Sequence, residues 1–221
     1  MRESTLCEPE DRSGSKQDTI QRLQNSALKL FSSHGFEGTS LRDIANDADV
    51  PLSTINRYFG SKLDFFKELE SRIWKDVNRD RDALMKRPIE VDDAGRPTLR
   101  AVLYAFVRPV VLLATGGASN AAAIRLLREY AAMRVHSGLG SSFTTVAERW
   151  VNAIMAARPD LPRARAVWML AFIVSLTFSD QIQHGWYDEL MPADSHISPD
   201  DLTNMIITFC RSGVQAVAES S

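Results

Sequence analysis

Residues 40–62 read SLRDIANDADVPLSTINRYFGSK, and this stretch decides how the chain folds. Ser40 and Asp43 have the spacing of a capping box, which predicts a short helix that starts at Ser40. A second short helix is predicted over residues 51–59, with Pro51 in its first turn. Between the two helices, Asp49 tolerates the positive φ that a tight turn requires. The pattern is typical of a helix-turn-helix.

The second of these helices has two faces of different chemistry. Ile55 and Phe59 lie four residues apart on one face, where we expect them in the core. The opposite face carries side chains that form hydrogen bonds: Ser53, Thr54, Asn56, Arg57 and Tyr58. In a helix-turn-helix this face enters the major groove of DNA. A solvated helix face has a similar composition, so these residues alone leave both interpretations open.

Short sequence elements recur in order around this stretch, in ALKLFSSHGFEGTSLRDIANDADVPLSTINRYFGSKLDFFKEL. They are Ala27–Phe31, Gly35-Phe36, Thr39-Ser40, Ile44-Ala45, Tyr58-Phe59 and Ser61-Lys62. In this order and spacing, from about Thr19 to Glu70, the chain resembles the TetR family of bacterial transcriptional regulators. It is similar to the TetR/AcrR-type branch with an Asn-x-Tyr-Phe-Gly-Ser-Lys string.

The resemblance implies several contacts with the phosphates of DNA. Thr39 and Ser40 stand at the start of the first short helix, where hydroxyls and backbone N–H groups meet phosphate. Lys62 is expected to make another phosphate contact from the start of the next helix. Arg42 projects from the first short helix and reaches either the backbone or an adjacent base.

The resemblance also implies contacts with bases. Arg57 is the best candidate for a bidentate contact with guanine, and Asn56 for adenine. Tyr58 is expected to touch phosphate or a thymine methyl group, and Ser53 and Thr54 share the same surface.

Three positions depart from the pattern of the family. Asp49 replaces the usual Gly of the turn, Pro51 replaces the usual Ser or Thr, and Asn56 replaces an aromatic residue. Residues 16–62 hold 6 basic and 5 acidic side chains. Because this surplus is small, we expect modest non-specific affinity, with most discrimination arising from base contacts and symmetry.

The predicted fold class is all-α, with about nine helices in total. We expect a disordered tail at 1–16, a helix-turn-helix DNA-binding domain at 17–65 and a connecting helix to about residue 86. A helical ligand-binding and dimerisation domain is expected at 87–221. Its apolar periodicity and its Gly and Pro breaks predict helices near residues 98–114, 120–136, 142–157, 162–184 and 198–218.

Apolar stripes on the last two predicted helices are candidates for a dimer interface. They comprise Val167, Ala171, Val174, Phe178, Leu202, Met205, Ile206, Phe209 and Gly213. Core packing within one chain is the alternative explanation. In the family the last two long helices of each subunit form a four-helix interface, which would place two recognition helices about 34–36 Å apart on a palindrome.

Large side chains cluster in the same part of the chain and are candidates for a ligand pocket. They are Tyr104, Phe106, Tyr130, Met133, Phe143, Trp150, Trp168 and Phe172. A mostly apolar pocket between helices is the expected ligand site, although ordinary core packing is the alternative for each residue.

Composition excludes several classes of protein. The 221 residues carry a net charge of -2 and 44% hydrophobic residues, which are ordinary values for a globular chain. There is no apolar run of 18 residues and no secretory signal, so we expect no membrane partner and a cytoplasmic protein. The resemblance implies that the protein is bacterial and nucleoid-associated when bound to DNA. The 2 cysteines and 4 scattered histidines form neither a metal site nor a catalytic set, so no cofactor and no enzymatic activity are expected.

The sequence therefore predicts a homodimeric, DNA-binding transcriptional regulator. Its expected partners are a double-stranded DNA operator, a second copy of itself and a small-molecule effector. We expect a repressor that binds a palindromic operator and is released by a small hydrophobic ligand. A helical protein–protein adaptor that has lost DNA binding is the first alternative, motivated by Asp49 and Pro51, and an enzyme is the second.

Overall fold

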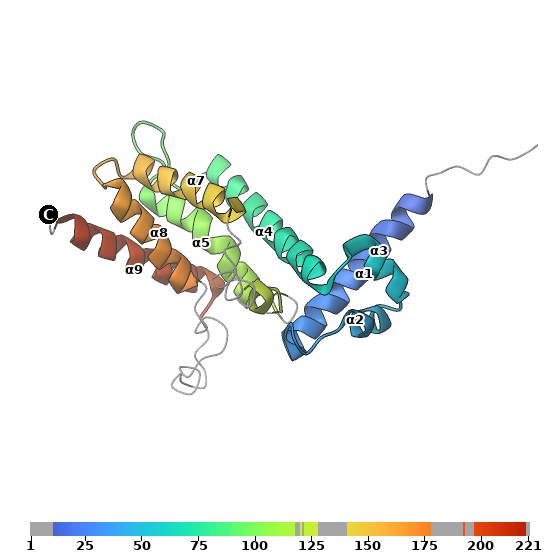
Figure 1. The fold of residues 1–221 in the computed structure, drawn as a ribbon. Coiled ribbons are helices and arrows are strands. Elements are labelled where there is room, and N and C mark those ends of the chain that lie inside the picture. The colour runs from blue at the N-terminus through green and yellow to red at the C-terminus, as the bar shows by residue number, and fades with distance from the viewer. Residues whose placement is uncertain are drawn as a thin grey trace, which may run out of the picture. The chain divides into compact units, whose positions relative to one another are not determined.

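The structure is a computed structural model that describes residues 11–117, 120, 122–127, 141–177, 192 and 197–219. At 11–15, 141–143 and 214–219 the description covers the backbone only. The described residues contain helices and no strand, apart from one isolated bridge between Val91 and Pro97. The predicted all-α class is therefore confirmed (Figure 1).

The chain divides into two units, Met1–Ser71 and Arg72–Ser221. The helices of the first unit are α1 (Asp11–His34), α2 (Leu41–Asp47), α3 (Leu52–Phe59) and the first part of α4 (Lys62–Lys86). Their apolar sides meet in one core that contains Leu23, Ala27, Phe31, Ile44, Ile55, Phe65, Phe66 and Leu69. The ring of Phe66 packs edge-on against Phe31 and Phe36, at centroid distances of 5.2 and 4.9 Å. This core holds the two short helices, α2 and α3, in place beside α1.

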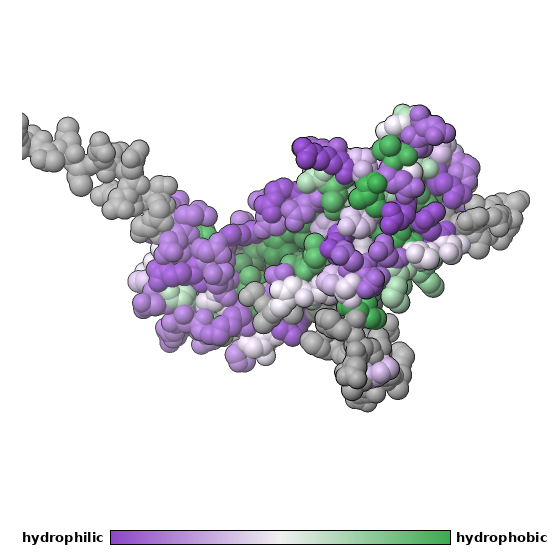
Figure 2. All heavy atoms as spheres, turned by 180° about the vertical axis from the view of Figure 1, so that it is seen from behind, coloured by the Kyte–Doolittle hydropathy of each residue, from purple (hydrophilic) through white to green (hydrophobic). Residues whose placement is uncertain are grey.

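The second unit contains the rest of α4 and a set of helices that lie side by side in Figure 1: α5 (Leu99–Thr115), α7 (Ser141–Ala157), α8 (Arg163–Thr177) and α9 (Pro199–Glu219). Residues 122–127 are also helical. The core of this unit includes Val102, Phe106, Trp150, Ile154, Ile173 and Ile207. On the face in Figure 2, hydrophilic residues cover most of the first unit, whereas hydrophobic residues reach the surface of the second.

Two predicted boundaries differ from the structure. Helix α1 begins at Asp11, so residues 11–16 are helical and do not belong to a disordered tail. The apolar stripe of α1 begins only at Ile20. Because Lys16, Gln17 and Asp18 are polar and exposed, the apolar pattern did not indicate that the helix begins before them. The two units separate inside α4, because Phe65, Phe66 and Leu69 join the first core and Val77 joins the second.

The predicted helices at 98–114, 142–157 and 198–218 agree with α5, α7 and α9 within one residue at each end. Those at 120–136 and 162–184 are described only in part, since residues 128–140 and 178–191 lie outside the description. Within the described ranges, no helix is both long and apolar enough to span a lipid bilayer.

Candidate functional site

Helix α2 begins with the predicted capping box. The backbone N–H of Asp43 donates to Ser40 Oγ at 3.1 Å, and the backbone N–H of Ser40 donates to the Asp43 carboxylate at 2.9 Å. The Ser40 hydroxyl also donates to that carboxylate, and this bond is the main reason that the pKa of Asp43 is lowered. The start of α2 is therefore fixed by its own side chains, and Ser40 lies exposed at this end.

The turn between α2 and α3 depends on Asp49, which has φ 53°. It is the one non-glycine residue with positive φ in the described part of the chain, as the sequence predicted for this turn. The Arg22 guanidinium of α1 donates to the carbonyls of Ala48 and Asp49, at 3.1 and 3.4 Å. This contact holds the turn against α1 and stabilises its left-handed residue.

Helix α3 buries one face and exposes the other. Ile55 is fully buried, and Phe59 stacks on Phe65 at a centroid distance of 4.0 Å. The opposite face lies at the surface: Ser53, Asn56 and Arg57 are exposed, and Thr54 and Tyr58 are half-buried. Pro51 is the N-cap residue of α3 and lies one position before its predicted place in the first turn.

Arg57 and Tyr58 form a pair on this exposed face. Arg57 Nη2 donates to Tyr58 Oη at 3.1 Å, and the guanidinium carbon lies 4.9 Å from the centre of the Tyr58 ring. Lys16 of α1 places its Nζ 5.6 Å from the same ring. Two cations therefore flank one aromatic ring at the end of α3.

The surface around this pair is hollowed, with a volume of about 280 Å³. Its lining combines α1, the turn and α3, and it includes Lys16, Thr19, Arg22, Thr54, Arg57 and Tyr58. The sequence interpretation did not assign the three α1 residues to the site. Their spacing of three residues, which places them on one side of a helix, was the signal that could have identified them.

Thr39 and Lys62 have structural contacts where phosphate contacts were predicted. Thr39 is only 3% exposed, and its hydroxyl donates to the carbonyls of Leu30 and Gly35. In this structure the Thr39 hydroxyl is therefore engaged within the chain, and the predicted phosphate contact has no free donor at this position. Lys62 Nζ donates to the carbonyls of Phe36 and Thr39, at 2.8 and 3.1 Å, and so holds the loop between α1 and α2.

Replacing Lys62 with methionine is expected to lower the free energy of unfolding by about 1–3 kcal/mol, because two charge-assisted hydrogen bonds are lost. Thermal unfolding followed by circular dichroism measures the change. Lys67→Met is the matched control, since a surface ion pair with Asp64 at 3.9 Å is the one polar contact that Lys67 makes with the described residues. If K62M keeps full stability and reduces the salt dependence of DNA binding, Lys62 is a phosphate contact and not a brace for the loop.

Arg42 and Ser40 lie exposed and remain candidates for phosphate contacts, although the hydroxyl and the N–H of Ser40 donate to Asp43 in the free chain. Arg42 is exposed on α2 and makes no hydrogen bond or ion pair with the residues that the structure describes. Its guanidinium is therefore available at the surface that also carries Ser40.

In the second unit, apolar residues of α8 and α9 lie at the surface. Trp168, Phe172, Met205 and Phe209 are 64%, 61%, 58% and 68% exposed. Val167, Ala171 and Gly213 are exposed with them, and we call these seven residues the α8–α9 apolar face. Among the other predicted interface residues, Val174, Leu202 and Ile206 are partly buried against the core, and Phe178 lies outside the described residues.

Two residues of the α8–α9 apolar face had been predicted to line the ligand pocket. Trp168 and Phe172 were assigned to the pocket, but they point outward from α8 with their ring centroids 5.8 Å apart. Tyr104 is half-buried, and Phe106 and Trp150 lie in the core and pack edge-to-face at 5.0 Å. Tyr130, Met133 and the side chain of Phe143 lie outside the described residues.

A buried arginine lies between these core aromatic residues. Arg81 of α4 is 2% exposed, and its guanidinium carbon lies 3.9 Å from the centre of the Phe106 ring. Its Nε donates to the Phe106 carbonyl at 3.0 Å, and Nη1 donates to Asn78. Burial, with a smaller contribution from the Arg149 charge, lowers the pKa of Arg81 to about 9. The surroundings therefore disfavour the charged form of this side chain.

Two buried donors of this cluster have no hydrogen-bond partner among the described residues, namely Arg81 Nη2 and Trp150 Nε1. Unpaired buried donors cost free energy, so their presence in a core calls for an explanation. The described part of the chain also contains no group of three or more His, Cys, Asp or Glu residues placed to hold a metal ion. Cys210 is a free thiol whose pKa is raised to about 11 by burial.

Two family models match the chain. Residues 24–69 match the model described as "Bacterial regulatory proteins, tetR family", and residues 104–213 match "Tetracyclin repressor-like, C-terminal domain". The first match contains α2, α3 and the second half of α1, and the second contains the α8–α9 apolar face.

Curated relatives agree with these matches. A probable HTH-type transcriptional regulator, YttP of Bacillus subtilis, is 36% identical over 29% of this chain and 31% of its own length. The HTH-type transcriptional repressor KstR of Rhodococcus jostii is 28% identical over 39% of this chain and 42% of its own length. The chain thus spans less than half the length of these two relatives. An uncharacterized HTH-type regulator of Xanthobacter autotrophicus is 29% identical over 92% of this chain and 96% of its own.

Solved structures share the fold over nearly the whole chain. A TetR-like transcriptional regulator from Rhodococcus sp. RHA1 aligns with a TM-score of 0.64 and 16% identity, over 89% of this chain and 96% of that one. The TetR-like regulator LfrR from Mycobacterium smegmatis, solved in complex with proflavine, aligns with a TM-score of 0.56 and 18% identity. The alignment covers 90% of this chain and 97% of that one. With its two-part domain organisation matched in order, the chain belongs to the TetR family of DNA-binding transcriptional regulators.

Proposed function

We propose that this regulator is a homodimeric repressor that binds a palindromic operator and is released by a small-molecule effector. The exposed polar face of α3 carries the proposal, because it presents Asn56, Arg57 and Tyr58 beside the cations of α1. Arg57 would contact guanine and Asn56 adenine, and Ser53 and Thr54 would complete the surface in the major groove. Ser40 and Arg42 would contact phosphates on one side of the groove.

The α8–α9 apolar face supports the homodimer. Four large apolar side chains on two neighbouring helices are each more than half exposed, and monomeric proteins rarely present so much apolar surface to water. A second copy of the same face is the natural occupant, since two-fold symmetry lets one patch cover itself. The dimer would present two copies of α3, which matches an operator with two half-sites.

The cluster around Arg81 supports an effector site in the second unit. Phe106 and Trp150 provide apolar surface, and Arg81 Nη2 and Trp150 Nε1 provide two donors without partners among the described residues. A hydrophobic molecule that carries a hydrogen-bond acceptor would satisfy both. Repression is suggested by the KstR relatives, which are named repressors, and a small ligand by the proflavine complex of LfrR.

Replacing Arg81 with methionine is expected to raise the free energy of unfolding by about 1 kcal/mol, because a desolvated charge is exchanged for apolar volume of similar length. Urea denaturation measures the change. Arg79→Met is the control, since Arg79 of the same helix makes surface ion pairs with Asp76 and Asp80, and its loss should change stability little. A loss of more than about 2 kcal/mol in R81M would mean that the guanidinium stabilises the core and is not kept for an effector.

The proposed repressor is tested with the DNA upstream of its own gene. Gel shifts should show saturable binding to one fragment, with affinity that falls steeply as salt rises, because phosphate contacts release counterions. A reporter fused to that fragment should increase in expression when the gene is deleted. Decreased expression after deletion would identify an activator, and equal binding to scrambled DNA would reject an operator in this fragment.

A further inference from the structure

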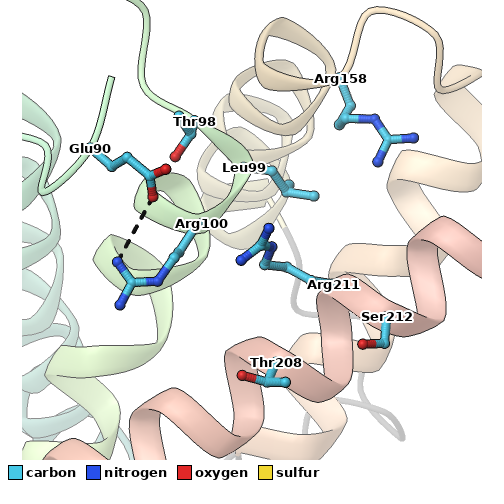
Figure 3. Close-up of a pocket in the computed structure, with 8 residues that line it drawn as sticks. All are labelled: Glu90, Thr98, Leu99, Arg100, Arg158, Thr208, Arg211 and Ser212. Carbon is cyan, nitrogen blue, oxygen red and sulfur yellow. Dashed lines mark ion pairs between the residues drawn. The ribbon is translucent and has the colours of Figure 1, made fainter. Parts of the chain in front are cut away.

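A hollow of about 360 Å³ lies in the second unit, at the start of α5 (Figure 3). Three arginines line it: Arg100 from α5, Arg158 from the turn after α7, and Arg211 from α9. Glu90 supplies the one carboxylate of the lining. The hollow therefore has a positive surplus, although the chain as a whole is slightly acidic.

The three arginines differ in how fully they are engaged. Arg158 donates from Nε and Nη2 to both carboxylate oxygens of Asp160, at 2.8 and 2.7 Å, and these bonds raise its pKa. Arg100 is held loosely, with Nη1 3.8 Å from Glu90 and Nη2 3.4 Å from Asn204. Arg211 makes no hydrogen bond or ion pair with any residue that the structure describes. Two guanidinium groups are thus available to a further acceptor.

Figure 3 shows how these groups converge. The Arg211 side chain extends from α9 toward Leu99 and Arg100, on the side of α9 that faces α5. Thr208 and Ser212 lie on the same lining, one helical turn apart, and each adds a hydroxyl group. The N-cap of α5, Thr98, also borders the hollow, so the positive end of that helix adds to the field.

We propose that this hollow binds a small molecule that carries an oxyanion group, a carboxylate or a phosphate, between Arg211 and Arg100. Guanidinium groups match the oxygens of both anions in a planar, bidentate geometry, and the hydroxyls of Thr208 and Ser212 add neutral donors. The site is distinct from the effector site at Arg81, because it is lined by charged and hydroxyl-bearing side chains and not by aromatic ones. Its volume suits a small metabolite.

Isothermal titration calorimetry of the full-length protein tests the proposal, in chloride buffer at constant ionic strength. The probes are inorganic phosphate, glycerol phosphate and succinate, so that phosphate and carboxylate ligands are compared. We expect saturable binding of at least one probe, one per chain, weakened about tenfold or more by Arg211→Ala and less by Arg211→Lys. The absence of saturable binding by all three probes overturns the proposal.

Arg125→Ala is the matched control, because Arg125 is exposed in the same unit and does not line the hollow. It should bind the probe as the wild type does. If R125A weakens binding as much as R211A, the anion is attracted by general charge and the proposed site is rejected. The titration contains no DNA, so its outcome is independent of whether the repressor and operator proposed above are correct.

Discussion

Replacing Phe209 with glutamate is expected to convert the proposed dimer to a monomer at micromolar concentration. The dissociation constant of the dimer should rise by at least about thirtyfold, which corresponds to about 2 kcal/mol for a large side chain at the centre of an interface. Operator affinity should fall about a hundredfold or more, because a monomer engages one half-site and loses the gain from linked binding. Sedimentation velocity and gel shifts measure the two effects.

The physical reason is the α8–α9 apolar face. Phe209 is 68% exposed in the single chain, so the substitution removes little from the core of its own unit. In a dimer the same side chain would be covered by apolar groups of the partner, and a carboxylate there would be buried without a partner charge. The substitution should therefore weaken the association of two chains and leave the folding stability of each chain nearly unchanged.

Leu112→Glu is the matched control, because Leu112 is an apolar residue of α5 that is 45% exposed and is not part of the α8–α9 apolar face. It should remain a dimer with wild-type affinity for the operator. A dimeric F209E variant would reject this face as the interface.

Replacing Arg57 with alanine is expected to weaken operator binding by about 1–3 kcal/mol, or about five- to 150-fold, and to change non-specific binding little. In the free protein Arg57 donates to Tyr58 Oη and stacks on its ring, a contact that holds the guanidinium at the surface of α3. An arginine ordered in this way loses little conformational freedom when it contacts a guanine. Fluorescence anisotropy with operator and scrambled duplexes measures both affinities.

Two controls distinguish base recognition from charge. Arg42→Ala should weaken binding to operator and scrambled DNA to a similar extent and reduce the salt slope by about one, as a phosphate contact does. Arg163→Ala removes a surface arginine that pairs with Glu148 in the second unit, and it should leave both affinities unchanged. If R57A binds operator as tightly as the wild type, another residue of α3 reads the bases.

The local features of the helix-turn-helix could be predicted because they follow from neighbouring residues. The capping box needs only Ser40 and Asp43, and the positive φ of Asp49 follows from the short turn that it occupies. The buried face of α3 follows from helical spacing, as Ile55 shows. In each case the cause lies within one or two turns of chain.

Features that depend on distant residues were missed. Thr39 has the right chemistry for a phosphate contact, but its hydroxyl is used by two carbonyls of α1 and the loop after it. From residue 166 to residue 174 helix α8 is apolar on all sides, so its sequence does not separate Ile173, which is 1% exposed, from Trp168, which is 64% exposed. The three arginines of the hollow come from α5, the turn after α7 and α9, which only the packing of these helices against one another brings together.

The unusual start of α3 has a consequence for how this helix meets DNA. Pro51 offers no side-chain acceptor for the first turn, and its own carbonyl receives the N–H of Thr54 at 2.9 Å. The N–H groups of Leu52 and Ser53 are left for an outside acceptor at the positive end of the helix. An operator phosphate is an acceptor of that kind. In that case the operator itself would cap α3, because one of its phosphates would accept from the N–H groups that the chain leaves without a side-chain acceptor.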